Sequence, residues 1–129
     1  MKSKSGFTVL ELVICIVFVG IFVVLFFMQK TNVDAMNRDQ QRKVAINAMF
    51  YSLEEGFYEQ NGHYPETIFE DNLPTMDPNL FTDPHGINIG DPASSYRYEP
   101  ANCLEGKCKQ YTLRAIMEKE DDYIKSSRR

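Results

Sequence analysis

The sequence contains few of the residues that usually catalyse reactions. Only two of its 129 residues are histidines, His63 and His85, and both stand among residues that form turns. No serine or cysteine in a nucleophile motif lies beside either of them. We therefore expect two exposed loop histidines and a protein that is not an enzyme.

The chain is also short and has no excess of basic residues. It contains 14 lysines and arginines against 18 aspartates and glutamates, and its formal net charge is −4. This balance gives no indication of general affinity for nucleic acid. A length of 129 residues allows one small domain with one modest core.

Charge is almost absent from the stretch Phe7 to Met28, in which Glu11 is the only charged residue. A helix of this length extends for about 33 Å, against about 30 Å for the hydrocarbon core of a bilayer. Residues 7–28 therefore predict a membrane helix. Because Lys2 and Lys4 precede it, we expect a single-pass protein with a cytoplasmic N-terminus and an extracytoplasmic head.

Glu11 is unusual in such a stretch. A carboxylate at the centre of a membrane helix costs about 2.5 to 3.5 kcal/mol, so a chain that keeps one is expected to supply a partner for it. A cut between Gly6 and Phe7 would place a new α-amino group one helical turn from Glu11, within reach of its carboxylate or that of a neighbouring copy. Such a cut would create the missing cation.

The N-terminal pattern G-F-T-V-L-E-L-V-I, followed by Gly20 and Ile21, resembles the class III signal of type IV pilins and type II secretion pseudopilins. The resemblance implies that residues 1–6 are a leader peptide, which a prepilin peptidase removes by cutting between Gly6 and Phe7. It also implies that the Phe7 amine is methylated and that an assembly machinery polymerises the subunit through its N-terminal helices. The membrane would hold the subunit before assembly, and an extracellular filament afterwards.

Two other interpretations of the N-terminus stay open. An ordinary secretory signal also begins with a short basic region, and Val33-Asp34-Ala35 offers a small residue for its cut. Its apolar core, however, should be about 7 to 15 residues long and free of acid. A plain membrane anchor with an incidental acid explains the length and the charge, but it makes the Gly6–Phe7 spacing a coincidence.

The helix is expected to continue beyond the apolar stretch, over residues 29–62. No proline interrupts Phe7 to Tyr64, so we predict a nearly continuous helix of about fifty residues. Its second half carries an apolar stripe at helical spacing, made of Ala45, Ile46, Ala48, Met49, Leu53 and Phe57. Gly62 is placed to cap the end of the helix, and Pro65 prevents its continuation. The string from Phe57 to Pro65 also resembles the helix exit of many pilins and major pseudopilins.

The remainder of the chain divides into three parts. Residues 63–95 contain many prolines, asparagines, aspartates and glycines, and predict a surface connection with short helical turns, including a tight turn at Asp83–Gly86. Residues 96–117 alternate apolar and polar side chains, and predict an antiparallel hairpin packed on the helix. The expected inward side chains are Tyr96, Tyr98, Tyr111, Leu113 and Ala115. Residues 118–129 are charged and short, so we expect them to fray.

The three cysteines have different surroundings. Cys103 and Cys108 lie in the part predicted to face an oxidising compartment, where a disulfide is the natural interpretation. A metal site would need two further ligands at the usual spacing, and none is present. Cys15 lies in the apolar stretch, where a small packing residue is expected.

Calcium is the one cofactor that the sequence leaves open. Asp77, Asp83 and Asp91, with Asn79 and Asn88, are oxygen donors in one segment, and the resemblance to major pseudopilins implies calcium in this part of the head. Their spacing is not that of an EF-hand loop, and aspartate before proline is ordinary turn chemistry. We therefore predict no cofactor or metal and keep calcium as the alternative.

Together these features predict an α+β, type IV pilin-like protein: a long N-terminal helix, with an apolar stem first, packed on a small C-terminal antiparallel sheet. The expected function is that of a structural pilin subunit of an extracellular filament, which serves adhesion, motility or DNA uptake. One alternative is a pseudopilin of a type II secretion or DNA-uptake system. An alternative of another class is a monomeric, membrane-anchored binding module that uses residues 66–95 to hold a ligand.

Overall fold

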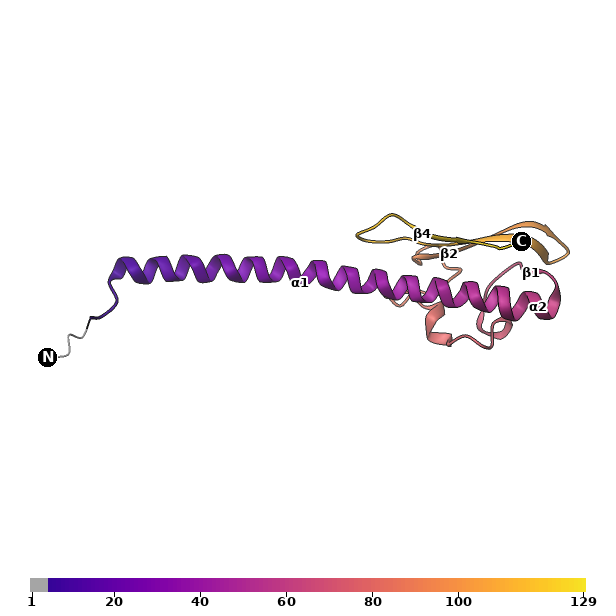
Figure 1. The fold of residues 1–129 in the computed structure, drawn as a ribbon, viewed down its shortest axis with the longest axis horizontal. Helices are drawn as coiled ribbons and strands as arrows, with labels where there is room; N and C mark the ends of the chain where they lie inside the picture. The colour runs from indigo at the N-terminus through magenta and orange to yellow at the C-terminus, as the bar shows by residue number, and fades with distance from the viewer. Residues whose placement is uncertain (1–4) are drawn as a thin grey trace. The chain divides into compact units, whose positions relative to one another are not determined.

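The computed structural model describes residues 5–129, so the part of the predicted leader before Ser5 lies outside the described residues. The chain forms two compact units, Met1–Asp34 and Ala35–Arg129, which are described separately below. Both contain part of one long helix, α1, which runs over Val9–Tyr51 (Figure 1). A π-helical turn, η1 (Ser52–Phe57), and a short helix, α2 (Tyr58–Asn61), follow α1 without a break. The expected long N-terminal helix is therefore confirmed.

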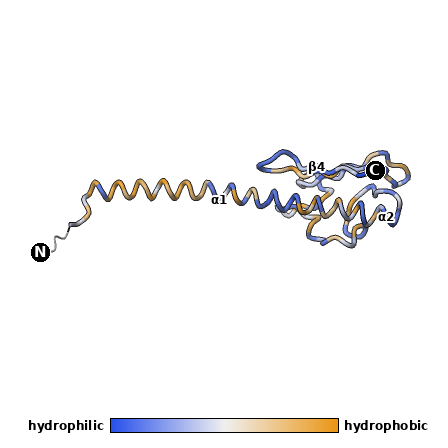
Figure 2. Tube along the Cα trace, viewed as in Figure 1, coloured by the Kyte–Doolittle hydropathy of each residue, from blue (hydrophilic) through white to orange (hydrophobic). Residues whose placement is uncertain are grey.

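In the first unit, α1 is apolar from Val9 to Met28, and its side chains there are exposed. Figure 2 shows most of this part of the helix as hydrophobic. Its large apolar side chains from Val9 to Met28 are 47% to 81% exposed. Within the described residues this is the one helix that is long and apolar enough to cross a membrane. The expected single span is thus present as a helix of suitable length and composition.

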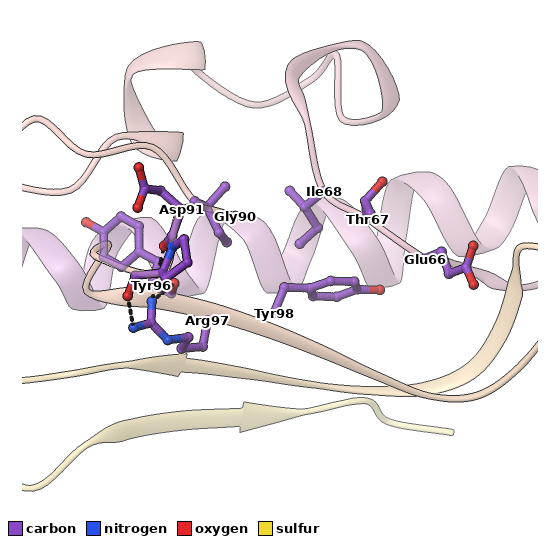
Figure 3. A pocket seen from close by; sticks show the side chains of 10 residues that line it. Glu66, Thr67, Ile68, Gly90, Asp91, Tyr96, Arg97 and Tyr98 are labelled. Atoms are coloured by element: carbon purple, nitrogen blue, oxygen red, sulfur yellow. Dashed lines mark hydrogen bonds between the residues drawn. The ribbon is translucent and has the colours of Figure 1, made fainter.

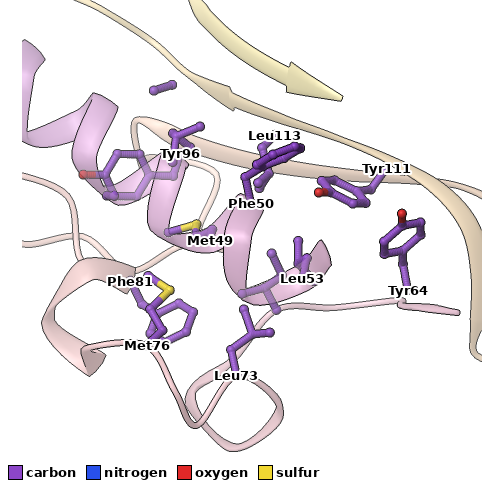
Figure 4. Packing of buried hydrophobic residues seen from close by; sticks show 14 of the residues in the cluster. Met49, Phe50, Leu53, Tyr64, Leu73, Met76, Phe81, Tyr96, Tyr111 and Leu113 are labelled. Carbon is purple, nitrogen blue, oxygen red and sulfur yellow. The ribbon is translucent and has the colours of Figure 1, made fainter. Parts of the chain in front are cut away.

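The second unit has a core of its own, built on the second half of α1. Ile46, Met49 and Leu53 of the predicted stripe are completely buried, and Ala45 is nearly so. They pack with apolar side chains of the strands and of the connecting segment, several of which Figure 4 shows. These partners include Tyr64, Leu73, Met76, Phe81, Tyr96, Tyr111 and Leu113.

The predicted and observed faces of the helix differ at η1. The N–H of Tyr58 donates to the carbonyl of Leu53, five residues earlier, which is the spacing of a π-helix. The wider turn changes the phase of the helix, so Phe57 is only half-buried while the acid Glu54 is buried. Gly62 ends the helix in the left-handed region with φ of 72°, as its position predicted.

An antiparallel sheet of four strands lies along α1 in the second unit (Figure 1). Strand β2 (Tyr96–Leu104) and strand β3 (Lys107–Ala115) form the predicted hairpin, with Tyr98 opposite Leu113. The side chains expected to face inward are buried, apart from Tyr98, which is half-buried. Strand β1 (Tyr64–Pro65) pairs with the start of β3, with Tyr64 opposite Cys108.

The prediction that the tail frays is wrong. Its residues Tyr123–Ser126 form a fourth strand, β4, which pairs with β3 from Thr112 to Ala115. Strand β2 occupies one side of β3, so β1 and β4 share the other side at its two ends. Composition alone suggested a loose tail, but β3 offers these residues an edge on which to pair.

After β1, most of the connecting segment, residues 66–95, lies on the opposite side of α1 from the sheet in Figure 1. As predicted, it contains short helical turns, η2 (Glu70–Asn72) and η3 (Pro78–Phe81). The expected turn at Asp83 forms as well, because the N–H of Gly86 donates to the Asp83 carbonyl at 2.9 Å. Ile68, Leu73, Met76 and Phe81 anchor the segment in the core.

Candidate functional site

The predicted cleavage site lies just before the start of the long helix. Residues 5–8 have no regular structure and are exposed, and α1 begins at Val9. Thr8 caps the helix, since its Oγ1 accepts a hydrogen bond from the N–H of Glu11 at 3.3 Å. The Gly6–Phe7 bond therefore lies in an accessible, non-helical segment, which is the form of chain that a peptidase can bind.

The Glu11 side chain is exposed in the first turn of α1. A negative charge at this place interacts favourably with the helix dipole, by about 0.3 to 1 kcal/mol at an exposed site. From Ser5 to Arg129, however, no hydrogen bond or ion pair reaches its carboxylate. In a hydrocarbon environment the carboxylate would therefore need a partner beyond the described residues.

The second unit contains a polar cluster that the sequence did not predict, between α1 and the segment after β3. Asp39 and Arg42 are almost completely buried. Arg42 Nη1 donates to Asp39 Oδ1 at 2.8 Å and to Glu118 Oε2 at 2.7 Å. The Asp39 carboxylate also accepts the N–H groups of Glu118 and Lys119, each at 2.9 Å. Arg38 completes the cluster with a bidentate pair to Glu118 at 2.7 and 2.9 Å.

This cluster changes the acidity of both carboxyl groups. Hydrogen bonds from Arg38 and Arg42 lower the pKa of Glu118 to about 2. Burial by itself raises the pKa of Asp39, but the N–H groups of Glu118 and Lys119 and the Arg42 guanidinium outweigh burial and lower it below its usual range. Both acids are therefore held in the charged form that fixes the segment after β3 to the helix.

A second polar cluster surrounds Glu54 in the π-helical turn. The Glu54 side chain accepts the Tyr111 hydroxyl at 2.8 Å, the Tyr64 hydroxyl at 3.0 Å and the N–H of Arg128 at 3.1 Å. Burial, and after it the neighbouring Glu54 carboxylate, raise the pKa of Tyr64 and Tyr111 above the ordinary tyrosine value. A buried acid thus connects helix, sheet and C-terminal tail.

The acids considered for calcium do not gather. The carboxylate of Asp77 accepts the N–H of Asn79, and that of Asp91 accepts the N–H of Ala93. Asp83, which is buried, accepts the N–H groups of His85, Ile87 and Ser95 at 2.8 to 2.9 Å. Within residues 5–129, no three histidine, cysteine, aspartate or glutamate side chains lie together as metal ligands. The carboxylates of these acids accept backbone N–H groups and thereby stabilise the turns of the connecting segment.

The remaining candidates occupy ordinary structural positions. Cys103 and Cys108 form the expected disulfide near the tip of the β2–β3 hairpin. Cys15 is a free, exposed thiol on the apolar part of α1. His85 is exposed as predicted, whereas His63 is half-buried and its ring contacts Phe57 edge-on.

The residues that sequence reasoning missed are those whose partners lie far along the chain. Asp39 lies among Arg38, Arg42 and Lys43 on one stretch of α1, and this mixture of opposite charges is a visible signal of ion pairs. Glu118, the partner of Arg38 and Arg42, is 80 residues away from Arg38, and no local pattern identifies it or Glu120, the partner of Lys43. For Glu54, an acid beside an apolar stripe was the only signal.

Comparison with known proteins adds no family to this description. No family model, no curated protein and no solved structure matches the chain. An assignment of function therefore rests on the geometry of the described residues and on the N-terminal pattern.

Proposed function

We propose that the chain is a pilin-like structural subunit. It is cut between Gly6 and Phe7, carries a methylated amine on Phe7, and polymerises through its N-terminal helix into an extracellular filament. Before assembly, the apolar half of α1 holds the subunit in the membrane with the head outside.

One observation carries the proposal: the apolar half of α1 is exposed from Val9 to Met28, and the carboxylate in its first turn has no partner within residues 5–129. A contiguous apolar surface of this size is not stable in water. It needs lipid, or the same surface of other copies. An ordinary anchor would satisfy the apolar side chains, but it would leave Glu11 in hydrocarbon without a cation.

The cut would supply the cation that Glu11 needs and would help to align neighbouring stems. It creates an α-amino group on Phe7, one helical turn from Glu11, and this cation can neutralise the carboxylate of the same chain or of a neighbour. Pairing between chains favours one axial register of the stems. Repeated contacts of this kind, between unlike surfaces, build an open helix and not a closed ring.

The test is intact mass and N-terminal sequencing of the protein sheared from the surface of the producing cells. We expect a chain that begins at N-methylated Phe7. A Gly6→Val variant is the matched control, because a branched side chain beside the bond should block the cut and leave the chain in the membrane fraction. If the unchanged chain begins at Met1 and stays in the membrane, it is an anchored module; if it begins at Met36, it is an ordinary secreted protein.

A further inference from the structure

The sheet of the second unit has one open edge, along β2. Within residues 5–129, β2 pairs with β3 and with no other strand, whereas β1 and β4 cover the far side of β3. An open strand edge presents main-chain donors and acceptors to any chain that can lie beside it.

The hydrogen bonds identify which residues face this edge. The N–H of Ile116 donates to the Ser95 carbonyl at 2.8 Å, which makes these two residues a hydrogen-bonded pair. Because the main-chain groups of an antiparallel strand alternate in direction, those of Arg97 and Glu99 face β3. Those of the residues between them, including Tyr98, face outward.

The alternation of main-chain groups along β2 explains why the strand can contain a proline. Pro100 follows Tyr98 by two residues, so its missing N–H is on the open side, where β3 loses no bond. Tyr96 also faces outward, but its N–H donates to Ser94 Oγ and its carbonyl accepts Arg97 Nη1, each at 3.1 Å. Tyr98 therefore offers the one complete donor and acceptor pair along the outward edge from Tyr96 to Pro100, because no partner reaches its N–H or carbonyl within residues 5–129.

A cavity of about 220 Å³ lies beside this part of β2 (Figure 3). The residues around Ile68 and around Ile89 line it, and Tyr98 lines it from the strand. The cavity is thus large enough for one side chain of medium size and has apolar side chains in its lining.

The charges at the cavity favour a cationic ligand. Glu66 and Asp91 line it, and Glu99 is exposed on the strand next to it. The one cation among the lining residues, Arg97, folds back on the chain, where it donates to the carbonyls of Ser94, Tyr96 and Pro92 (Figure 3). Two carboxylates therefore line the cavity and a third is exposed on the strand next to it, against one guanidinium that is already hydrogen-bonded.

We propose that this edge binds an extended peptide segment that carries lysine or arginine. The segment adds a strand to the sheet beside β2, exchanges two main-chain hydrogen bonds with Tyr98, and places one aliphatic side chain between Ile68 and Ile89. Its basic residues lie near Glu66, Asp91 and Glu99. This binding surface is independent of the filament function proposed above, because it involves no residue of the apolar stem.

The test uses the full ¹⁵N-labelled chain in neutral detergent micelles and the peptide acetyl-Ser-Lys-Val-Lys-Ser-amide. We expect the Tyr98 amide resonance to shift and to saturate at millimolar peptide. The charge-reversed peptide acetyl-Ser-Glu-Val-Glu-Ser-amide should bind at least fivefold more weakly. The peptide acetyl-Ser-Lys-Pro-Lys-Ser-amide should give no saturating shift, because its central residue has no N–H to donate.

Variants of the protein sharpen the result. Glu66→Gln combined with Glu99→Gln should weaken the lysine peptide several-fold, while the remote, exposed Glu55→Gln should leave its binding unchanged. The proposal is overturned if the Tyr98 amide does not respond, or if all three peptides shift it equally. It is also overturned if the amide shifts with protein concentration alone, because a second copy of the chain would then occupy the edge.

Discussion

Glu11 and Glu54 lie on one continuous run of helix, yet their surroundings are opposite. Glu54 is 2% exposed and accepts hydrogen bonds from two tyrosine hydroxyls and a backbone N–H of its own chain. The Glu11 carboxylate has no such donor anywhere from Ser5 to Arg129. The second unit therefore supplies partners for its own acid, whereas the described residues of the first unit supply none.

The apolar side chains of the two units differ in the same way. Ile46, Met49 and Leu53 are fully buried by the strands and the connecting segment of the second unit. Val9 to Met28 are exposed although they are more continuously apolar. A core that is complete within one chain explains how the second unit folds, and an exposed apolar surface is what the proposed assembly would cover.

Replacement of Glu11 should have the largest effect, and the effect should be on assembly. We expect Glu11→Ala to leave the cut after Gly6 intact and to lower the yield of sheared filament at least tenfold, because stems without the acid lose the contact that sets their register. The measurement is the amount and the N-terminal sequence of sheared protein. Asp34→Ala, which removes an exposed acid beyond the apolar stretch of α1, is the control. Normal filaments from Glu11→Ala would contradict the role.

Replacement of Glu54 should destabilise the second unit without affecting the stem. Glu54→Ala leaves the buried hydroxyls of Tyr64 and Tyr111 without their acceptor, which should lower the free energy of unfolding by about 2 to 4 kcal/mol. Its neighbour Glu55 is 61% exposed, so Glu55→Ala should change that free energy by less than about 0.5 kcal/mol. Both changes in unfolding free energy are measured by denaturant unfolding of the full chain in micelles, with the circular dichroism of the tyrosines as the signal. If both variants lowered the unfolding free energy equally, the burial of Glu54 would not be the cause of its contribution to stability.

The sequence was sufficient where a local pattern decides the structure. The stripe around Met49, the cap at Gly62 and the alternation of Tyr111 and Leu113 each depend on neighbours within a few residues, and each was predicted correctly. The disulfide was predictable for the same reason, because Cys103 and Cys108 are five positions apart.

Prediction failed where the partner is distant or the helix changes its phase. The tail looked loose because its charged composition does not reveal that β3 has a free edge for it. The burial of Glu54 depends on the π-helical turn. The 3.6-residue period of an α-helix does not predict where a turn contains an extra residue. The contacts of Asp39 with Glu118 and Lys119 likewise join segments that only the fold brings together.

Acid should weaken the second unit in a defined range of pH. The pKa values of Asp39 and Asp83 are lowered, and that of Glu118 falls from 4.5 to about 2. A lowered pKa in the folded state contributes stability that is present above the unfolded value and is lost as protons bind. We therefore expect the unfolding temperature to be level near neutral pH and to fall between about pH 4.5 and pH 2. Glu118→Gln should flatten this fall, whereas an equally steep fall in that variant would assign the effect to other acids.

The disulfide should contribute least, although within residues 5–129 it is the only covalent cross-link between the side chains of two strands. The loop that it closes is so short that the chain-entropy model gives about 2 kcal/mol, and it lies at the exposed tip of the hairpin. In a Cys15→Ser background, which removes the free thiol and thereby prevents exchange, Cys103→Ser with Cys108→Ser should lower the unfolding free energy by about that amount and leave the fold intact. Amide hydrogen exchange should increase near Gly106 and stay unchanged around Met49. If this variant unfolds, the core of the second unit is not sufficient to keep it folded. The second unit would then differ from the apolar half of α1 by its cross-link, and not by a core that is complete within one chain.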